Sequence, residues 1–263
     1  MERFEIVNRY GLKIVGEITL PESPTGCAFI MHGLGGRKEE KHMLLLAKIL
    51  ASRNYTTVNF DATNATGESE GRYEDATMEK HYEDLVDVIT WAKTQLWFKQ
   101  PFLLAGHSMG GFAVTKYAEE FPEEVSALFP FAAVYSGKDS LEAHEKFDHE
   151  ELTKWRETGW VKRTSKSRPH LDLKLPWSHM EERLKHDLYL KSRNLTMPTL
   201  FVVGSEDTRC PPYQQENFYN KLPENTVKEI HTIQGAPHTF REQENLDQLG
   251  EIFSKWLTKL STI

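Results

Sequence analysis

The sequence predicts an α/β protein with a mostly parallel β-sheet flanked by helices. In the first half of the chain, short apolar runs typical of buried strands alternate with segments whose apolar residues recur at helical spacing. The same alternation returns near the C-terminus. Because helices that connect strands form right-handed crossovers, this order favours parallel pairing of the strands.

The individual elements follow from local patterns. Alternating apolar and polar residues predict strands at 4–7 and 12–20, which a turn at Tyr10-Gly11 would join as an antiparallel hairpin. Further strands are expected at 27–32, 55–60, 102–106 and 125–135. The helices between them are expected at 39–53, 77–96 and 110–120.

The segment 137–191 breaks this pattern, since it holds many charges, few continuous apolar runs and three of the six tryptophans. The alternation then resumes with a strand at 197–204, a helix near 213–221, a strand at 227–233 and a final helical stripe from Leu246 to Leu260. We therefore expect a core domain formed by 1–136 and 192–263, with an inserted lid at 137–191 that covers a site.

Composition limits the classes of function. The 263 residues include 39% apolar and 27% charged residues and carry a net charge of −7. This balance excludes a disordered chain and argues against a nucleic-acid partner. The N-terminus has no apolar signal core and the longest apolar run, 127–135, is too short to span a bilayer, so we expect a cytoplasmic protein without a membrane partner. Two distant cysteines, Cys27 and Cys210, predict reduced thiols.

The strongest chemical signal is the stretch Gly106-His107-Ser108-Met109-Gly110-Gly111, between a predicted strand and a predicted helix. It matches the G-x-S-x-G turn, in which flanking glycines allow the backbone to present a nucleophilic serine at the edge of a sheet. We therefore predict that Ser108 is a nucleophile. The alternative is a glycine-rich turn that only reverses the chain. His107 is expected to pack or hydrogen-bond beneath the turn.

A serine nucleophile needs a base that an acid orients, and in this kind of turn the chain order is serine, acid, histidine. His238 follows the last predicted strand and is the expected general base. Asp207 follows the strand at 197–204 and is the expected acid, with a role in a turn or as a helix cap as its alternative. Glu206 and Asp139 remain rival acids.

A second glycine-rich stretch, His32-Gly33-Leu34-Gly35-Gly36, follows the third predicted strand. Such a loop can point backbone N–H groups at a developing oxyanion, and the expected donors are the N–H groups of Leu34 and Met109. A flexible strand-to-helix loop is the alternative. The stretch matches neither phosphate-binding pattern, and the histidines of 137–191 lack zinc spacing, so neither a metal nor another cofactor is expected.

Together these motifs resemble the α/β-hydrolase superfamily over the whole chain. Within it they resemble bacterial serine esterases of the cinnamoyl/feruloyl-esterase-like group. The resemblance implies an eight-stranded sheet, a triad of Ser108, His238 and Asp207, and a lid inserted after the sixth strand. One departure concerns the substrate: many relatives carry Asp-x-Arg-Gly-His-Gly-x-Ser after the fourth strand, whereas residues 61–69 here lack the Arg-Gly-His.

We expect a serine hydrolase that cleaves small-molecule carboxylic esters, with short-to-medium acyl or hydroxycinnamoyl groups, through an acyl-enzyme on Ser108. A non-catalytic receptor on the same fold, and an amide, thioester or carbon–carbon hydrolase with the same triad, are the alternatives. The oligomeric state, including a homodimer, stays open.

Two features of the lid bear on specificity. Trp160, beside Gly159, is expected at the wall of the substrate pocket, with a purely anchoring role as the alternative. The stretch 154–174 has seven basic and two acidic residues, a local charge of +5. It is either a solvated face of the lid or a surface that steers an acidic substrate.

Overall fold

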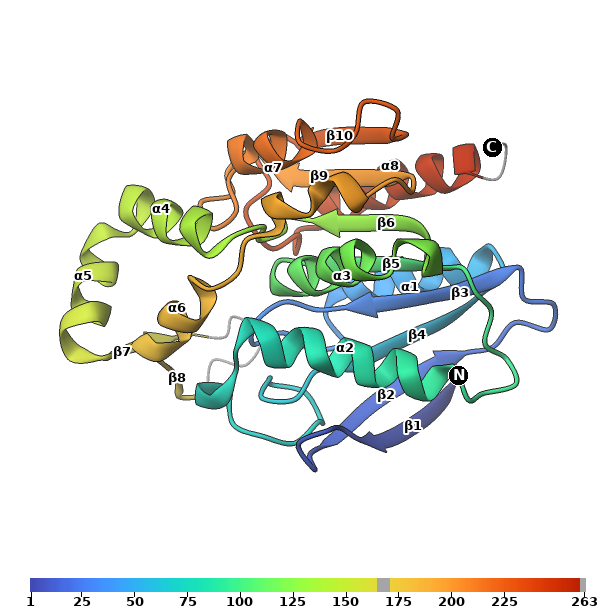
Figure 1. The fold of residues 1–263 in the computed structure, drawn as a ribbon, viewed down its shortest axis with the longest axis horizontal. Coiled ribbons are helices and arrows are strands. Elements are labelled where there is room, and N and C mark those ends of the chain that lie inside the picture. Colours follow the sequence, from blue (N-terminus) through green and yellow to red (C-terminus); the bar gives the residue numbers. More distant parts are fainter. Residues whose placement is uncertain (165–170, 261–263) are drawn as a thin grey trace.

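The computed structural model describes residues 1–164 and 171–260, and its centre is an eight-stranded sheet (Figure 1). β2 runs antiparallel to both β1 and β4, and the other neighbouring strands are parallel. The expected N-terminal hairpin and mostly parallel sheet are thus confirmed. In spatial order the strands are β1 (Glu2–Val7), β2 (Lys13–Thr19), β4 (Tyr55–Asp61), β3 (Gly26–Met31), β5 (Phe102–His107), β6 (Val125–Phe131), β9 (Thr199–Gly204) and β10 (Lys228–Ile233).

Helices cover both faces of the sheet. On one face lie α1 (Lys41–Ser52) and α8 (Gln243–Leu260), and on the other lie α2 (Met78–Ala92), α3 (Met109–Glu120) and α7 (Pro212–Tyr219). Side chains alternate between the faces, so Phe29 of β3 packs towards α2 and α3 while Ile30 packs towards α1 and α8. This double cover explains why the central strands are apolar on both sides.

Short 3₁₀ helices occupy several connections between the main elements. They are η1 (Tyr73–Asp75), η2 (Pro122–Glu124), η3 (Leu188–Leu190) and η4 (Ser192–Asn194).

Two predicted elements end earlier than the sequence pattern suggests. The strand expected to reach residue 135 stops at Phe131, because Ala132 adopts a left-handed φ of 44° and turns the chain away from the sheet. The helix expected to reach residue 96 stops at Ala92, and Leu96 is fully exposed. Leu96 has the spacing of the buried stripe but lies beyond the end of the helix that would have directed it inward.

The inserted segment 137–191, hereafter the cap, lies beyond the carboxyl ends of the central strands (Figure 1). It has a small apolar core of its own, which includes Leu152, Trp155 and Met180 and which Tyr73 of η1 completes from the core domain. Its elements are α4 (Gly137–Phe147), α5 (His149–Thr158), a hairpin of β7 (Trp160–Arg163) and β8 (Leu173–Pro176), and α6 (Trp177–Arg183).

Membrane-spanning helices and metal-binding clusters are both absent from residues 1–164 and 171–260. None of the helices there has the length and apolar character needed to cross a bilayer. The same residues contain no group of three or more His, Cys, Asp or Glu side chains that could hold a metal ion.

The junction between β3 and α3 gives a test of this packing. A Cβ atom at Gly110 would lie 2.3 Å from the carbonyl oxygen of Met31, a backbone contact that cannot relax cheaply. Gly110→Ala should therefore lower the free energy of unfolding by about 1–3 kcal/mol. At Gly250 in α8 the nearest atom, on Leu45, would be 3.4 Å away, so Gly250→Ala should stabilise by about 0.5–1 kcal/mol. Denaturant melts of both variants check the contrast, and equal effects would contradict it.

Candidate active site

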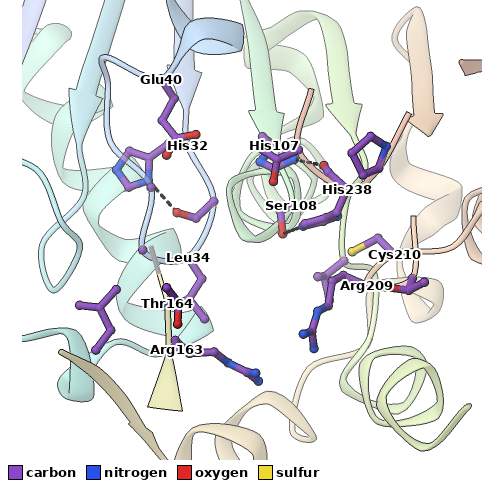
Figure 2. Close-up of a pocket in the computed structure, with 18 of the residues that line it drawn as sticks. His32, Leu34, Glu40, His107, Ser108, Arg163, Thr164, Arg209, Cys210 and His238 are labelled. Carbon is purple, nitrogen blue, oxygen red and sulfur yellow. Dashed lines mark hydrogen bonds between the residues drawn. The ribbon is translucent and has the colours of Figure 1, made fainter. Parts of the chain in front are cut away.

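The turn between β5 and α3 holds Ser108 in a strained conformation. Its φ of 54° and ψ of −115° are unusual for a residue with a side chain and cost about 1–3 kcal/mol. Backbone hydrogen bonds fix the turn on both sides, because Ser108 donates its N–H to Phe131 and accepts from Phe112 and Val134. The hydroxyl is thereby presented at the carboxyl end of β5, where it lines a cavity (Figure 2).

His238 connects Ser108 to a buried carboxylate. Its Nε2 lies 3.0 Å from Ser108 Oγ, and its Nδ1 lies 2.8 Å from Oδ2 of Asp207. A carboxylate only accepts hydrogen bonds, so Nδ1 carries the proton and Nε2 is left to accept from the serine hydroxyl. The structure therefore brings together the three side chains that the sequence proposed, from three loops at one edge of the sheet.

Asp207 is held from its other side as well. Its Oδ1 accepts the backbone N–H groups of Arg209 at 2.8 Å and Cys210 at 2.9 Å. The turn-capping role considered as an alternative is thus fulfilled by the same carboxylate that contacts His238, and its side chain is fully buried. Of the rival acids, neither Glu206 nor Asp139 contacts His238 in the described part of the chain, and burial raises the pKa of Asp139.

His107 lies beneath the turn, as the sequence analysis expects. Its Nε2–H donates to the carbonyl oxygen of His238 at 2.9 Å, and its ring packs against the rings of His42 and His238. Burial lowers the pKa of His107 well below its usual range, so the ring is neutral. The residue next to the serine therefore supports the loop that carries His238.

The glycine-rich loop after β3 lies against Ser108. A Cβ atom at Gly33 would be 2.9 Å from the Cβ of Ser108, so only glycine permits this approach. Within residues 1–164 and 171–260, the backbone N–H groups of Leu34 and Met109 have no hydrogen-bond acceptor. Met109 also begins α3, where the helix dipole is positive. Both N–H groups are thus free to serve a ligand.

His32 fixes this loop in place. Its Nδ1–H donates to the carbonyl of Gly33 at 2.7 Å, and its Nε2 accepts the N–H of Ala62 at 3.0 Å. Ala62 lies in the loop that lacks the Arg-Gly-His of many relatives. That loop is anchored by Asp61, whose carboxylate accepts the N–H groups of Lys38 and Glu68. The altered loop therefore still braces the backbone beside Ser108.

The cavity has a volume of about 540 Å³ and lies between the sheet edge and the cap. Apolar and aromatic side chains of Leu34, Val134, Trp155, Leu173 and Leu175 form part of its wall. Sequence reasoning did not place several polar residues of this wall, among them Tyr73, His144, Arg163, Arg183 and Arg209. They come from separate segments and share no motif, so only the folded chain shows that they meet.

Trp160 does not line the cavity, contrary to the sequence-based expectation. It is 50% exposed, because side chains alternate along β7 and the neighbouring Val161 is the one that faces the core of the cap. The tryptophan in the cavity wall is Trp155 of α5, which is 1% exposed.

The basic stretch of the cap is mostly a solvated face. Four of its seven basic residues are exposed: Lys154, Arg156, Lys162 and Lys174. Two others, Lys166 and Arg168, lie outside the described residues. Of the basic residues that are described, only Arg163 lines the cavity.

A doubly wound sheet that presents a strained serine next to a histidine and a buried aspartate is the arrangement of the α/β hydrolases. Comparison with known families agrees, since the model of the Hydrolase_4 family, described as serine aminopeptidase, S33, matches residues 22–244. The chain belongs to this family.

Individual relatives are distant. An acyl transferase from Photobacterium phosphoreum is 21% identical over 79% of this chain and 67% of its own length. Among solved structures, Est1E from Butyrivibrio proteoclasticus with bound ferulic acid has a TM-score of 0.81 at 21% identity, covering 99% of this chain and all of the other. The mouse alpha/beta hydrolase domain-containing protein 10 has a TM-score of 0.79 at 17% identity, covering 99% of this chain and 100% of that one. At these identities the structures establish the fold.

The choice of acid gives a prediction. Asp207→Asn should lower kcat by up to about 10⁴-fold, because an amide would favour the wrong tautomer of His238. Asp139→Asn is the matched control and should leave kcat within about threefold, since Asp139 makes no contact with His238. A severe loss in Asp139→Asn at unchanged melting temperature, with a mild effect in Asp207→Asn, would place the acid after β6 instead.

Proposed function

We propose that this α/β hydrolase cleaves carboxylic esters through an acyl-enzyme on Ser108. The observation that carries the proposal is the continuous hydrogen-bonded chain from Ser108 through His238 to Asp207, which opens onto a cavity large enough for a small molecule. A serine side chain is unreactive by itself, and this chain supplies the base that activates it.

In the proposed reaction, Ser108 Oγ attacks the ester carbonyl while its proton passes to Nε2 of His238. Asp207 stabilises the imidazolium and fixes its orientation. The carbonyl oxygen becomes an oxyanion that the N–H groups of Leu34 and Met109 bind. The C–O bond to the alcohol then breaks, and His238 returns the proton to the leaving oxygen. Water repeats the attack on the acyl-enzyme, again through His238, and releases the acid. No step needs a cofactor.

The acyl group is proposed to be of short-to-medium length or of the hydroxycinnamoyl type. Support comes from the cavity wall, where Trp155, Leu173 and Leu175 offer apolar area and Tyr73 an aromatic ring. Further support is that a structure of the same fold holds ferulic acid. Aromatic side chains bury large areas and pack well against flat groups.

Two other reactions use the same parts. The family description names an aminopeptidase, and one relative is named an acyl transferase. Amide hydrolysis and transfer of the acyl group to an alcohol instead of water should therefore be tested in the same assays. The same assays also test whether the protein is a receptor without activity.

The central experiment combines labelling with turnover. A fluorophosphonate probe should label Ser108 stoichiometrically, and p-nitrophenyl esters of increasing chain length and methyl ferulate should be hydrolysed. Ser108→Ala should lose about 10⁴-fold or more in kcat, because members of such a triad act as a unit. An unlabelled Ser108 without turnover would indicate a receptor. Ester hydrolysis that survives in Ser108→Ala would overturn the proposed nucleophile.

Two of the three tryptophans of the cap, Trp155 and Trp160, distinguish a residue of the pocket wall from a surface residue. Trp155→Phe should lower kcat/KM for methyl ferulate by about tenfold relative to p-nitrophenyl acetate, because it removes aromatic contact area. Trp160→Ala, the exposed control, should change both values by less than about twofold. An equal loss on both esters in Trp155→Phe, with a lower melting temperature, would mean that Trp155 only supports the cap.

A further inference from the structure

Four arginines line the cavity that Ser108 faces: Arg241, and three that contact the cap from separate segments. Arg163 comes from β7, Arg183 from the end of α6 and Arg209 from the loop that follows Asp207. Figure 2 shows the side chains of Arg163 and Arg209 reaching into the space beside Ser108. Four positive groups around one small cavity in a chain of net charge −7 call for a physical reason.

Two of these arginines are neutralised by the cap. Arg163 pairs with Glu151. Arg209 lies 3.0 Å from Asp148 and 3.8 Å from Glu151. These two carboxylates are partly exposed, at 30% and 37% of their side-chain surface. The pairs therefore account for two positive charges.

Arg183 has no such partner. It is 8% exposed, and no carboxylate of the described residues lies within ion-pair distance of it. The preceding Glu182 is committed elsewhere, because it accepts the N–H groups of Met78 and Glu79 and pairs with His186. The residues outside the description, 165–170 and 261–263, contain no Asp or Glu.

The groups that do contact Arg183 are neutral. Its guanidinium donates to Ser140 Oγ and, at 3.0 Å, to Nε2 of His179. The Nδ1–H of His179 donates to the carbonyl of Ala76, so its Nε2 is an acceptor, and burial lowers the pKa of His179 to about 3. Arg183 Nε is buried without an acceptor. Burial lowers the pKa of Arg183 to about 10, so the group is still charged at neutral pH.

His144 plays the same part for the other two arginines. Its Nδ1–H donates to the carbonyl of Ser140, and its Nε2 faces Arg209 at 3.2 Å and Arg163 at 3.5 Å. Burial lowers the pKa of His144 to about 3, so it also adds no charge. Three guanidinium groups against two carboxylates leave one positive charge in this part of the wall. Elsewhere in the wall lie the half-buried Arg241 and the acidic residues Glu40, Glu206 and Glu242. None of these acidic residues forms an ion pair with Arg163, Arg183 or Arg209 in the described part of the chain.

A buried charge without a counter-ion is costly. The contact of Arg183 in α6 with Ser140 in α4 does not explain this cost, because a neutral side chain could link the two helices equally well. From this we propose that Arg183 binds a carboxylate of the substrate, so that the hydrolase acts on esters that carry a free carboxylate, such as monoesters of dicarboxylic acids. A guanidinium offers paired donors that match a carboxylate, and one excess charge suits a monoanion better than a dianionic phosphate. The inference rests on the proposed function for its reaction and on Arg183 for its specificity.

The test compares esters that differ only in the remote group. Monoethyl succinate, adipate and suberate are paired with ethyl butanoate, hexanoate and octanoate, and the ratio of kcat/KM within each pair is measured. The wild-type ratio should exceed about 10 for at least one pair. Arg183→Gln should lower that ratio by about 10- to 100-fold, the scale of a charge-assisted hydrogen bond, while kcat/KM for the neutral ester stays within threefold. The exposed cap residue Arg156 supplies the control, and Arg156→Gln should leave the ratio unchanged.

Binding of monoethyl adipate and ethyl hexanoate to the Ser108→Ala protein, measured by calorimetry, separates this inference from the proposed reaction. Monoethyl adipate should bind more tightly, and Arg183→Gln in that background should abolish the difference. If the neutral esters are hydrolysed but neither rates nor binding favour the carboxylate, the carboxylate site is wrong and the hydrolase stands. If no ester is hydrolysed and binding of monoethyl adipate still depends on Arg183, the site stands and the hydrolase is wrong. An equal loss on both esters in Arg183→Gln, with a lower melting temperature, reduces Arg183 to a structural tether and overturns the inference.

Discussion

The site depends on one strained residue. Ser108 has a left-handed φ of 54° although it carries a side chain, and this conformation directs its hydroxyl away from the sheet. The strain persists because its surroundings leave the backbone no alternative: β5 ends at the turn, α3 begins on the other side, and hydrogen bonds from Phe112 and Val134 hold the Ser108 carbonyl. Gly33 then brings the neighbouring loop into contact with the serine.

The parallel sheet brings the remaining groups to the same place. Ser108, Asp207 and His238 each follow a strand, and the carboxyl ends of parallel strands meet at one edge. Backbone and ring contacts then refine the positions of these side chains. Asp207 accepts from two N–H groups of its own turn, and His107 supports the carbonyl of His238. These hydrogen bonds hold the His238 ring in line with Ser108 Oγ.

The cap adds Arg163 and Arg183 to a cavity wall in which the core domain already places charged residues, including Arg209 and Arg241. Its buried histidines, His144 and His179, are neutral acceptors that hold arginine side chains without neutralising them. Asp148 and Glu151 offset Arg163 and Arg209, whereas the buried Arg183 has no carboxylate partner in the described part of the chain. In the proposed function, the sheet edge would supply the serine and its base, and Arg183 of the cap would select among esters.

The sequence alone predicted the order of strands and helices in the sheet domain and singled out Ser108, Asp207 and His238, which the fold brings into contact, because apolar periodicity and short glycine motifs are local properties of the chain. It did not determine where elements end, as Leu96 and Ala132 show, since helix and strand ends depend on neighbouring backbone. It also predicted Trp160 for the pocket wall where the fold uses Trp155, because the direction of a side chain depends on the register of β7 against β8. Arg183 carried no sequence signal at all. Its proposed role is inferred from its neutral partners, Ser140 and His179, and from the lack of a carboxylate partner within residues 1–164 and 171–260. Only the tertiary structure decides which charged groups become neighbours.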